Sequence, residues 1–210
     1  LYENGLGVIQ NKKYALSLYK KGEDILLRKI KKNDLKAYHK LGDWYYRGVG
    51  LKVNKKKGLN LIKKAAEKGE LNSIFFLYQF YSNEIFIEDY KEIFIKENLI
   101  SINFNKSKEG HKWLNLSAEK CHPVGMYNLG QSYRNGLVVE VDYKLSLKWL
   151  SLSHIKFKQN DDEFMLSLAL DYIRLVKSFL KPNQILEAQN LVNIFVKENE
   201  EKMNKPFKPI

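Results

Sequence analysis

The chain has 210 residues, a net charge of +12 and a single cysteine, Cys121. No apolar run approaches the roughly 20 residues that a membrane-spanning helix needs, and one cysteine cannot form an intrachain disulfide. The composition therefore excludes a membrane span and a disulfide-stapled core within this sequence, while the length suffices for one continuous core.

One sequence motif occurs twice. Residues Ala37–Gly48 and Gly125–Gly136 both read small-x-x-x-Leu-Gly-x-x-Tyr-x-x-Gly. The leucine of this motif recurs as Leu41, Leu77, Leu129 and Leu168, at spacings of 36, 52 and 39 residues. A period of this size is typical of solenoids built from helix pairs, and the long middle interval indicates an insertion.

The spacing of the motif predicts a helix, a tight loop and a second helix. The small residue, Leu, Gly and Tyr fall on one helical face, where the glycine allows a neighbouring helix to approach closely. Gly48 and Gly136 are placed to end the first helices at positive φ. Asn54 and Asp142 are candidate N-caps of the second helices, and Asn11 is a third.

The repeats divide the chain into consecutive segments. We expect a partial first repeat with a lengthened second helix, a complete repeat, a repeat with an insertion at about 84–104, another complete repeat, a C-terminal capping helix pair, and a tail. The corresponding boundaries are 1–36, 37–70, 71–122, 123–160, 161–201 and 202–210. The chain opens inside a repeat without an initiator Met, so we expect a fragment of a longer protein, and an upstream signal peptide stays open.

These motif copies resemble the Sel-one-like repeat, a bacterial-type relative of the tetratricopeptide repeat. Residues Leu180–Gln189, with Pro182 near the start, also resemble the closing helix of bacterial members. The resemblance implies an all-α fold, a right-handed α/α superhelix of helix-turn-helix repeats with a terminal helical cap. It also implies a non-enzymatic adaptor, and it leaves open an exported or envelope-associated location.

The sequence contains no recognisable catalytic or metal-binding pattern. None of its four histidines lies at ligand spacing from another, and there is no phosphate-binding glycine loop or serine nucleophile elbow. Cys121 and His122 are adjacent, but neighbouring side chains generally point apart, so we interpret both as structural loop residues. We expect no catalytic residue, metal or cofactor.

The positive charge favours a lysine-coated, solvated surface over a specific nucleic-acid site. Only four basic residues are arginines, although arginine is the usual partner of base edges and of bidentate phosphate contacts. The abundance of Lys, Asn and Ile is also what AT-rich codon usage produces. A basic surface would still attract acidic partners or anionic membranes non-specifically.

The resemblance to tetratricopeptide-like solenoids places a partner on the concave face formed by the first helices. The groove positions lie two residues before the motif leucine and two, five and six residues after it. They comprise His39, Asp43, Tyr46 and Arg47; Phe75, Gln79, Ser82 and Asn83; and Tyr127, Gln131, Arg134 and Asn135. Aromatic, amide and cationic groups of this kind suit a protein or peptide; the alternative is that they are ordinary exposed residues.

The insertion at 84–104 is a second candidate surface. Residues 84–97 contain five acidic residues and two lysines among large apolar residues, which something must cover. Helices folding back on the solenoid are the favoured interpretation, and a surface for partner binding or self-association is the alternative. For the whole chain, the alternative to an adaptor is the repeat region of a larger enzyme or of a cell-wall-binding protein, with the catalytic part upstream.

Overall fold

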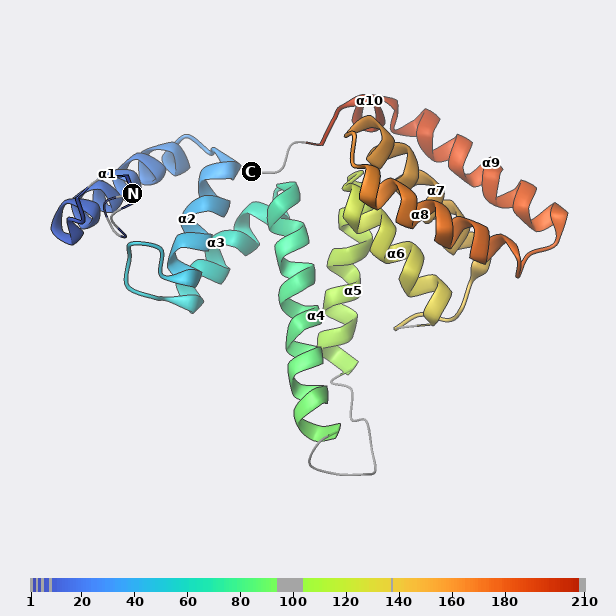
Figure 1. Ribbon diagram of the computed structural model, residues 1–210, viewed down its shortest axis with the longest axis horizontal. Coiled ribbons are helices and arrows are strands. Elements are labelled where there is room, and N and C mark those ends of the chain that lie inside the picture. The colour runs from blue at the N-terminus through green and yellow to red at the C-terminus, as the bar shows by residue number, and fades with distance from the viewer. Residues whose placement is uncertain are drawn as a thin grey trace. The chain divides into compact units, whose positions relative to one another are not determined.

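The computed structural model describes residues 2, 4, 6, 7, 9–93, 104–136 and 138–207, without the side chains of 83–107. Within these residues the elements are all helices that follow one another along the chain (Figure 1), so the predicted all-α class is confirmed. The chain forms two compact units, Leu1–Phe76 (unit 1) and Leu77–Ile210 (unit 2), which are treated separately below. The helices are α1 Lys12–Lys31, α2 Leu35–Arg47, α3 Lys55–Glu67, α4 Leu71–Ile93, α5 Phe104–Glu119, α6 Pro123–Asn135, α7 Tyr143–Gln159, α8 Glu163–Lys177, α9 Pro182–Glu198 and α10 Glu200–Asn204.

The ends of the helices follow the signals in the sequence. Asn11, Asn54 and Asp142 each accept a hydrogen bond from the backbone amide three residues later, so all three predicted N-caps are confirmed. Gly48 and Gly136 end α2 and α6 in the left-handed conformation, with φ of 79° and 69°. A side chain is strained at such φ values, which explains glycine at these two positions of the motif.

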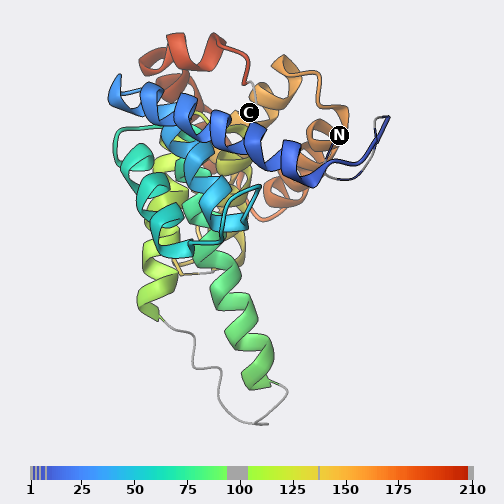
Figure 2. The ribbon, with the colours of Figure 1, turned by 90° about the vertical axis from the view of Figure 1, so that its left-hand side faces the viewer.

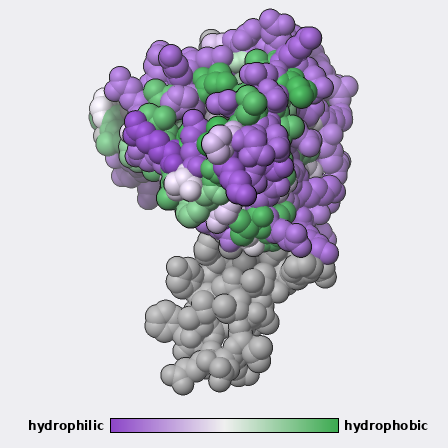
Figure 3. Space-filling view, turned by 90° about the vertical axis from the view of Figure 1, so that its right-hand side faces the viewer, coloured by the Kyte–Doolittle hydropathy of each residue, from purple (hydrophilic) through white to green (hydrophobic). Residues whose placement is uncertain are grey.

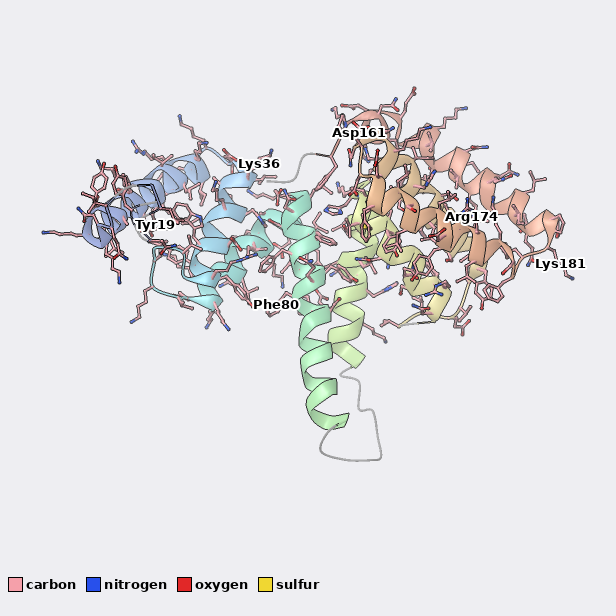
Figure 4. All side chains as sticks on the ribbon, in the orientation of Figure 1. Tyr19, Lys36, Phe80, Asp161, Arg174 and Lys181 are labelled. Atoms are coloured by element: carbon pink, nitrogen blue, oxygen red, sulfur yellow. The ribbon has the colours of Figure 1, made fainter. Side chains whose placement is uncertain are left out.

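Unit 1 has α2 at its centre. Leu26 of α1 packs against Ala37, Leu41 and Tyr45 of α2, and these residues form a buried core. Tyr19 on α1 meets Trp44 edge to face, with ring centroids 5.9 Å apart (Figure 4). Figure 2 shows α1 running across the front of this unit. The 20 residues of α1 compare with 13 in α3.

Unit 2 repeats this arrangement, with α6 packed against both α5 and α7. Leu129 of α6 lies in a buried cluster with Trp149 and Leu152 of α7 and Phe195 of α9. A second buried cluster joins Leu147 and Leu150 of α7 to residues of α8 and α9. On the α9 side of the unit, hydrophilic residues cover most of the surface, and hydrophobic residues form separate patches (Figure 3).

A junction of three residues links each repeat to the next, between α1 and α2, α3 and α4, α5 and α6, and α7 and α8. The middle residue of each junction has a positive φ; these residues are Asn33, Gly69, Cys121 and Asp161. The residue after it turns the chain into the next helix, and Asp34, His122 and Asp162 cap that helix with a side-chain acceptor. Cys121 and His122 therefore occupy the same structural junction as the pairs in the other repeats.

The C-terminal segment of unit 2 folds back onto the repeats. Lys156, which is 1% exposed, donates from Nζ to the carbonyl oxygens of Lys202, Met203 and Lys205. Met203 is buried, and the Phe207 ring lies 4.5 Å from the His122 ring. The sequence predicts a tail at residues 202–210. In the described part of it, to residue 207, Met203 instead packs in the core of unit 2, and Phe207 contacts His122.

The insertion begins within a helix. α4 continues to Ile93, so the first ten residues of the segment at 84–104 belong to this helix. Gly110 of α5 faces Tyr81 and Ser82 of α4, which places the two helices against each other within unit 2. The proposed self-association through 84–104 concerns side chains outside the described residues.

Candidate partner-binding residues

His39 of α2 is tied to the start of α4. Its Nδ1 atom lies 2.9 Å from the Ser73 hydroxyl oxygen and 3.7 Å from Oε2 of Glu70, which in turn accepts the Ser73 amide. Burial lowers the pKa of His39, although the Glu70 carboxylate acts in the opposite direction. The ring is thus held by the fold of unit 1 and is neutral at pH 7.

Phe76 packs against two aromatic rings of α2 in unit 1. Its ring meets His39 and Tyr46 edge to face, with centroids 6.3 Å and 5.4 Å away. Lys55 lies 5.7 Å from the centre of the Tyr46 ring. The predicted partner-binding residue Phe75 is half-buried. Its neighbour Phe76 is the residue that contacts the two predicted residues of α2, His39 and Tyr46.

Asp43 and Arg47 form an ion pair on α2. The Nε atom of Arg47 lies 2.6 Å from Oδ1 of Asp43, one helical turn away, and the Arg47 side chain is mostly exposed. Pairs of this kind contribute little to stability because solvent screens them. The guanidinium edge that does not face Asp43 remains accessible to a carboxylate from outside.

The strongest grouping is in unit 2, where Tyr127 and Arg134 of α6 contact Tyr172 of α8, and Gln131 of α6 contacts Arg134. Gln131 Oε1 accepts from Nε of Arg134 at 2.9 Å, and the Arg134 guanidinium lies 4.7 Å above the centre of the Tyr172 ring. The Tyr127 and Tyr172 rings are 6.0 Å apart. Burial raises the pKa of Tyr127, and the neighbouring Tyr172 raises it further. We call Tyr127, Gln131, Arg134 and Tyr172 the α6–α8 cluster.

The remaining predicted residues do not join a cluster in the described part of either unit. Gln79 on α4 and Asn135 at the end of α6 are exposed, and Ser82 is half-buried. The side chain of Asn83 lies outside the described residues. The structure therefore groups His39 with Tyr46 in unit 1, and Tyr127, Gln131 and Arg134 in unit 2.

Two residues of these groups escaped the sequence analysis. Tyr172 occupies the motif position of Tyr45 and Tyr133, which predicted a packing role, and only the neighbouring helix shows that its ring supports Arg134. Phe76 is the neighbour of the predicted Phe75. Spacing along the sequence predicts the position of a helix face only to within about one residue.

The described residues hold no set of three His, Cys, Asp or Glu side chains that could bind a metal ion. Burial raises the pKa of the Cys121 thiol and lowers that of His122 to about 4, the reverse of what an activated thiolate beside an imidazolium needs. Among the described helices, none is both long and apolar enough to cross a bilayer.

Comparisons with known proteins identify the repeats. The family model described as Sel1 repeat matches residues 1–24, 35–70 and 123–153. A crystal structure of a Sel1 repeat protein from Oxalobacter formigenes is similar over 92% of this chain and 72% of that one, with 19% identity and a TM-score of 0.52, which shows a shared fold. No curated protein matches the sequence significantly.

A second solved structure is c5321, a protective antigen of uropathogenic Escherichia coli with an SLR fold. It is 16% identical to this chain, with a TM-score of 0.40. The alignment covers all of this chain but only 55% of the antigen, so the chain spans about half the length of that protein.

Proposed function

Because this chain is a Sel1-repeat protein, we propose that it is a non-enzymatic scaffold that binds a protein or peptide partner on the first helices of its repeats. Stacked helix pairs bury a continuous core and leave the variable positions between the motif residues on the surface. In this chain those positions carry aromatic, amide and guanidinium groups, the residue types enriched where proteins meet.

The α6–α8 cluster is the observation that carries this proposal. The Tyr172 ring supports the Arg134 guanidinium from below, and Gln131 engages its Nε. These two contacts fix the plane of the guanidinium and leave its terminal nitrogens for a bidentate pair with a carboxylate. Tyr127 adds apolar area beside the cation. The cluster is suited to an extended peptide segment that carries an Asp or Glu side chain.

Affinity capture followed by mass spectrometry tests this function with two matched variants. The first, Tyr127→Ala/Arg134→Ala, removes one aromatic and one cation from the cluster. The control, Phe164→Ala/Lys158→Ala, removes the same two chemical types from exposed positions on α8 and α7 outside it. We expect the first variant to lose a partner that the wild type and the control retain.

The affinity of a captured partner then discriminates between specific recognition and non-specific binding. Loss of a buried guanidinium–carboxylate pair typically costs 2–5 kcal/mol, so Arg134→Ala should weaken binding by about 30-fold or more. Arg134→Lys should recover only part of it, since lysine cannot form the planar pair. A partner that binds both double variants as tightly as the wild type would refute the assignment of this face.

A further inference from the structure

The net charge of the protein is concentrated in unit 1. Residues 1–76 contain 18 Lys and Arg against 7 Asp and Glu, a net charge of +11. Residues 77–210 contain 18 basic and 17 acidic residues, a net charge of +1. Codon usage acts on the whole gene and predicts no such division, so the excess in unit 1 calls for a physical explanation.

Twelve of the 18 basic residues of unit 1 lie on two of its helices, α1 and α3. Glu23 of α1 accepts the Tyr45 hydroxyl of α2, and Lys57 of α3 donates to the same hydroxyl oxygen at 2.6 Å. At the other end, Nζ of Lys68, which follows α3, donates to Oδ1 of Asn33, which follows α1, at 3.1 Å. The two helices therefore run in the same direction on the same side of α2, and we call their solvent-facing surface the α1–α3 face.

The basic residues of this face lack acidic partners. α1 and α3 carry twelve Lys and Arg, all exposed, against three acidic residues, of which Glu23 is engaged by Tyr45. In the described part of the chain, none of the twelve forms an ion pair with a carboxylate, whereas unit 2 pairs Lys144 with Glu187 and Arg174 with Asp171. Like charges packed in this way repel each other, and an anionic partner would relieve the repulsion.

Large apolar side chains stand among these cations. Tyr14, Leu16, Leu18, Ile25 and Leu27 of α1 are each between 39% and 54% exposed. On α3 the surface forms an open basin of about 380 Å³, lined by Asn54, Lys56, Lys57, Asn60, Leu61 and Lys64. The face thus combines flexible ammonium groups, exposed aliphatic carbon and a shallow basin large enough to hold a phosphate-bearing headgroup.

From this combination we infer that the α1–α3 face docks unit 1 on an anionic phospholipid surface. Lysines at a bilayer surface contribute about 1 kcal/mol each by attraction to anionic headgroups, and exposed leucines and isoleucines insert between them. This function is separate from peptide binding by the α6–α8 cluster: it would place the scaffold at a membrane while its first helices hold a partner.

The residue types favour lipid over nucleic acid and over an acidic protein. Arg28 is the single arginine of the twelve, although base edges and phosphate forks favour arginine. Exposed leucines and isoleucines contribute nothing to contacts with a phosphate backbone. An acidic protein would be recognised through specific ion pairs at fixed positions, whereas lysines on both helices with apolar residues between them suit a fluid, extended anionic surface.

Vesicle co-sedimentation with the full chain tests this inference. The probe vesicles contain phosphatidylcholine alone, or phosphatidylcholine mixed with phosphatidylglycerol. The variant Lys20→Gln/Lys56→Gln/Lys64→Gln removes three charges from the α1–α3 face and spares Lys57, which supports Tyr45. The control Lys158→Gln/Lys177→Gln/Lys197→Gln removes three exposed lysines of unit 2, so both variants have the same net charge.

We expect the wild type and the control to bind the mixed vesicles, and neither to bind phosphatidylcholine alone. At about fivefold per lysine, the face variant should bind the mixed vesicles on the order of 100-fold more weakly. Raising the salt concentration should release the wild type. Leu16→Ser/Leu27→Ser, at two exposed positions that share one face of α1, should weaken vesicle binding on the order of tenfold at unchanged net charge, because inserted apolar area is lost.

Three outcomes would overturn the inference. Equal loss in the face variant and the control would mean that binding follows net charge and uses no particular face. Equal binding to both kinds of vesicle would remove the anionic requirement. Binding of duplex DNA at the same salt concentration, with the lysine variant impaired and the Leu16→Ser/Leu27→Ser variant unaffected, would reassign the face to polyanions. Circular dichroism of each variant establishes that it is folded.

Discussion

A Cβ atom on Gly42 would stand 2.9 Å from the backbone carbonyl oxygen of Gly58, and one on Gly58 would stand 2.6 Å from the carbonyl oxygen of Gly42. Real Cβ contacts to backbone are longer than this, so α2 and α3 cross at a separation that only two glycines allow. The Gly130 position of unit 2 is similarly close to Leu150 of α7, at 2.7 Å from its Cγ atom.

Gly42→Ala should therefore destabilise unit 1. The new methyl group meets backbone that cannot move alone, and overpacking of this kind costs about 1–3 kcal/mol. The gain in helix propensity, about 1 kcal/mol, offsets part of it. Urea unfolding measures the net loss, and hydrogen exchange should show it in α2 and α3.

The control for this substitution is Gly110→Ala in α5. Its Cβ would stand 3.3 Å from the Cβ atom of Tyr81, a contact that a shift of a few tenths of an ångström between α4 and α5 relieves. We expect this variant to be near neutral, because propensity and crowding oppose each other. Equal destabilisation by the two substitutions would show that the crossing of α2 and α3 tolerates more than its geometry indicates.

Leu129→Ala should be among the more damaging truncations in unit 2. Leu129 is fully buried in the cluster with Trp149 and Phe195, so the substitution loses buried area and leaves a cavity. The expected cost is about 2–5 kcal/mol, measured by thermal or chemical unfolding. Leu186→Ala on α9, where the leucine is mostly exposed, should cost far less. Similar losses for both would contradict the described packing.

Lys156→Met should free the C-terminal segment. Methionine fills a similar space but donates to none of the three carbonyl oxygens that Lys156 Nζ engages. Hydrogen bonds to a charged donor contribute about 1.5–3 kcal/mol, so residues 200–207 should open roughly 10- to 100-fold more often. Faster hydrogen exchange there, and faster tryptic cleavage after Lys202, would report the opening. Lys158→Met, an exposed neighbour, should change neither rate.

The stability of unit 2 should fall in mild acid because of His122. Burial lowers the pKa of His122 from 6.5 to about 4, while its Nδ1 accepts the Gly125 amide at 3.1 Å. The unfolded chain gains a proton below pH 6.5 and the folded chain resists it until about pH 4. The contribution of the neutral ring is therefore complete above pH 6.5 and is lost as the pH falls towards 4.

Comparison with His122→Asn isolates this effect. Asparagine retains an N-cap acceptor but does not titrate, so the difference in unfolding free energy between the two proteins should shrink by roughly 3 kcal/mol between pH 7 and pH 4. Burial also lowers the pKa values of His39 and His111, and both proteins share those contributions. A pH-independent difference would mean that His122 takes up its proton at the same pH in the folded protein as in the unfolded chain.

Much of the candidate partner site and of the C-terminal packing lay beyond prediction. The resemblance to tetratricopeptide-like repeats selected His39 and Tyr46 on α2 and Tyr127, Gln131 and Arg134 on α6, and each set shares a helix face because helical periodicity is a local property. The ring beneath Arg134 comes from α8, and the ring shared by His39 and Tyr46 is Phe76 rather than Phe75. Such pairings depend on how neighbouring helices are rotated, which spacing along one helix does not encode.

The sequence by itself determined the all-α repeat, the glycines that end α2 and α6, and the residues that cap α1, α3 and α7. Each is a local matter of backbone conformation or of a side chain reaching an amide three residues away. The tertiary structure alone decided that Lys156 holds the C-terminal segment and that the lysines of α1 and α3 share one surface. These relationships join residues far apart in the chain, and only packing sets the distance between them.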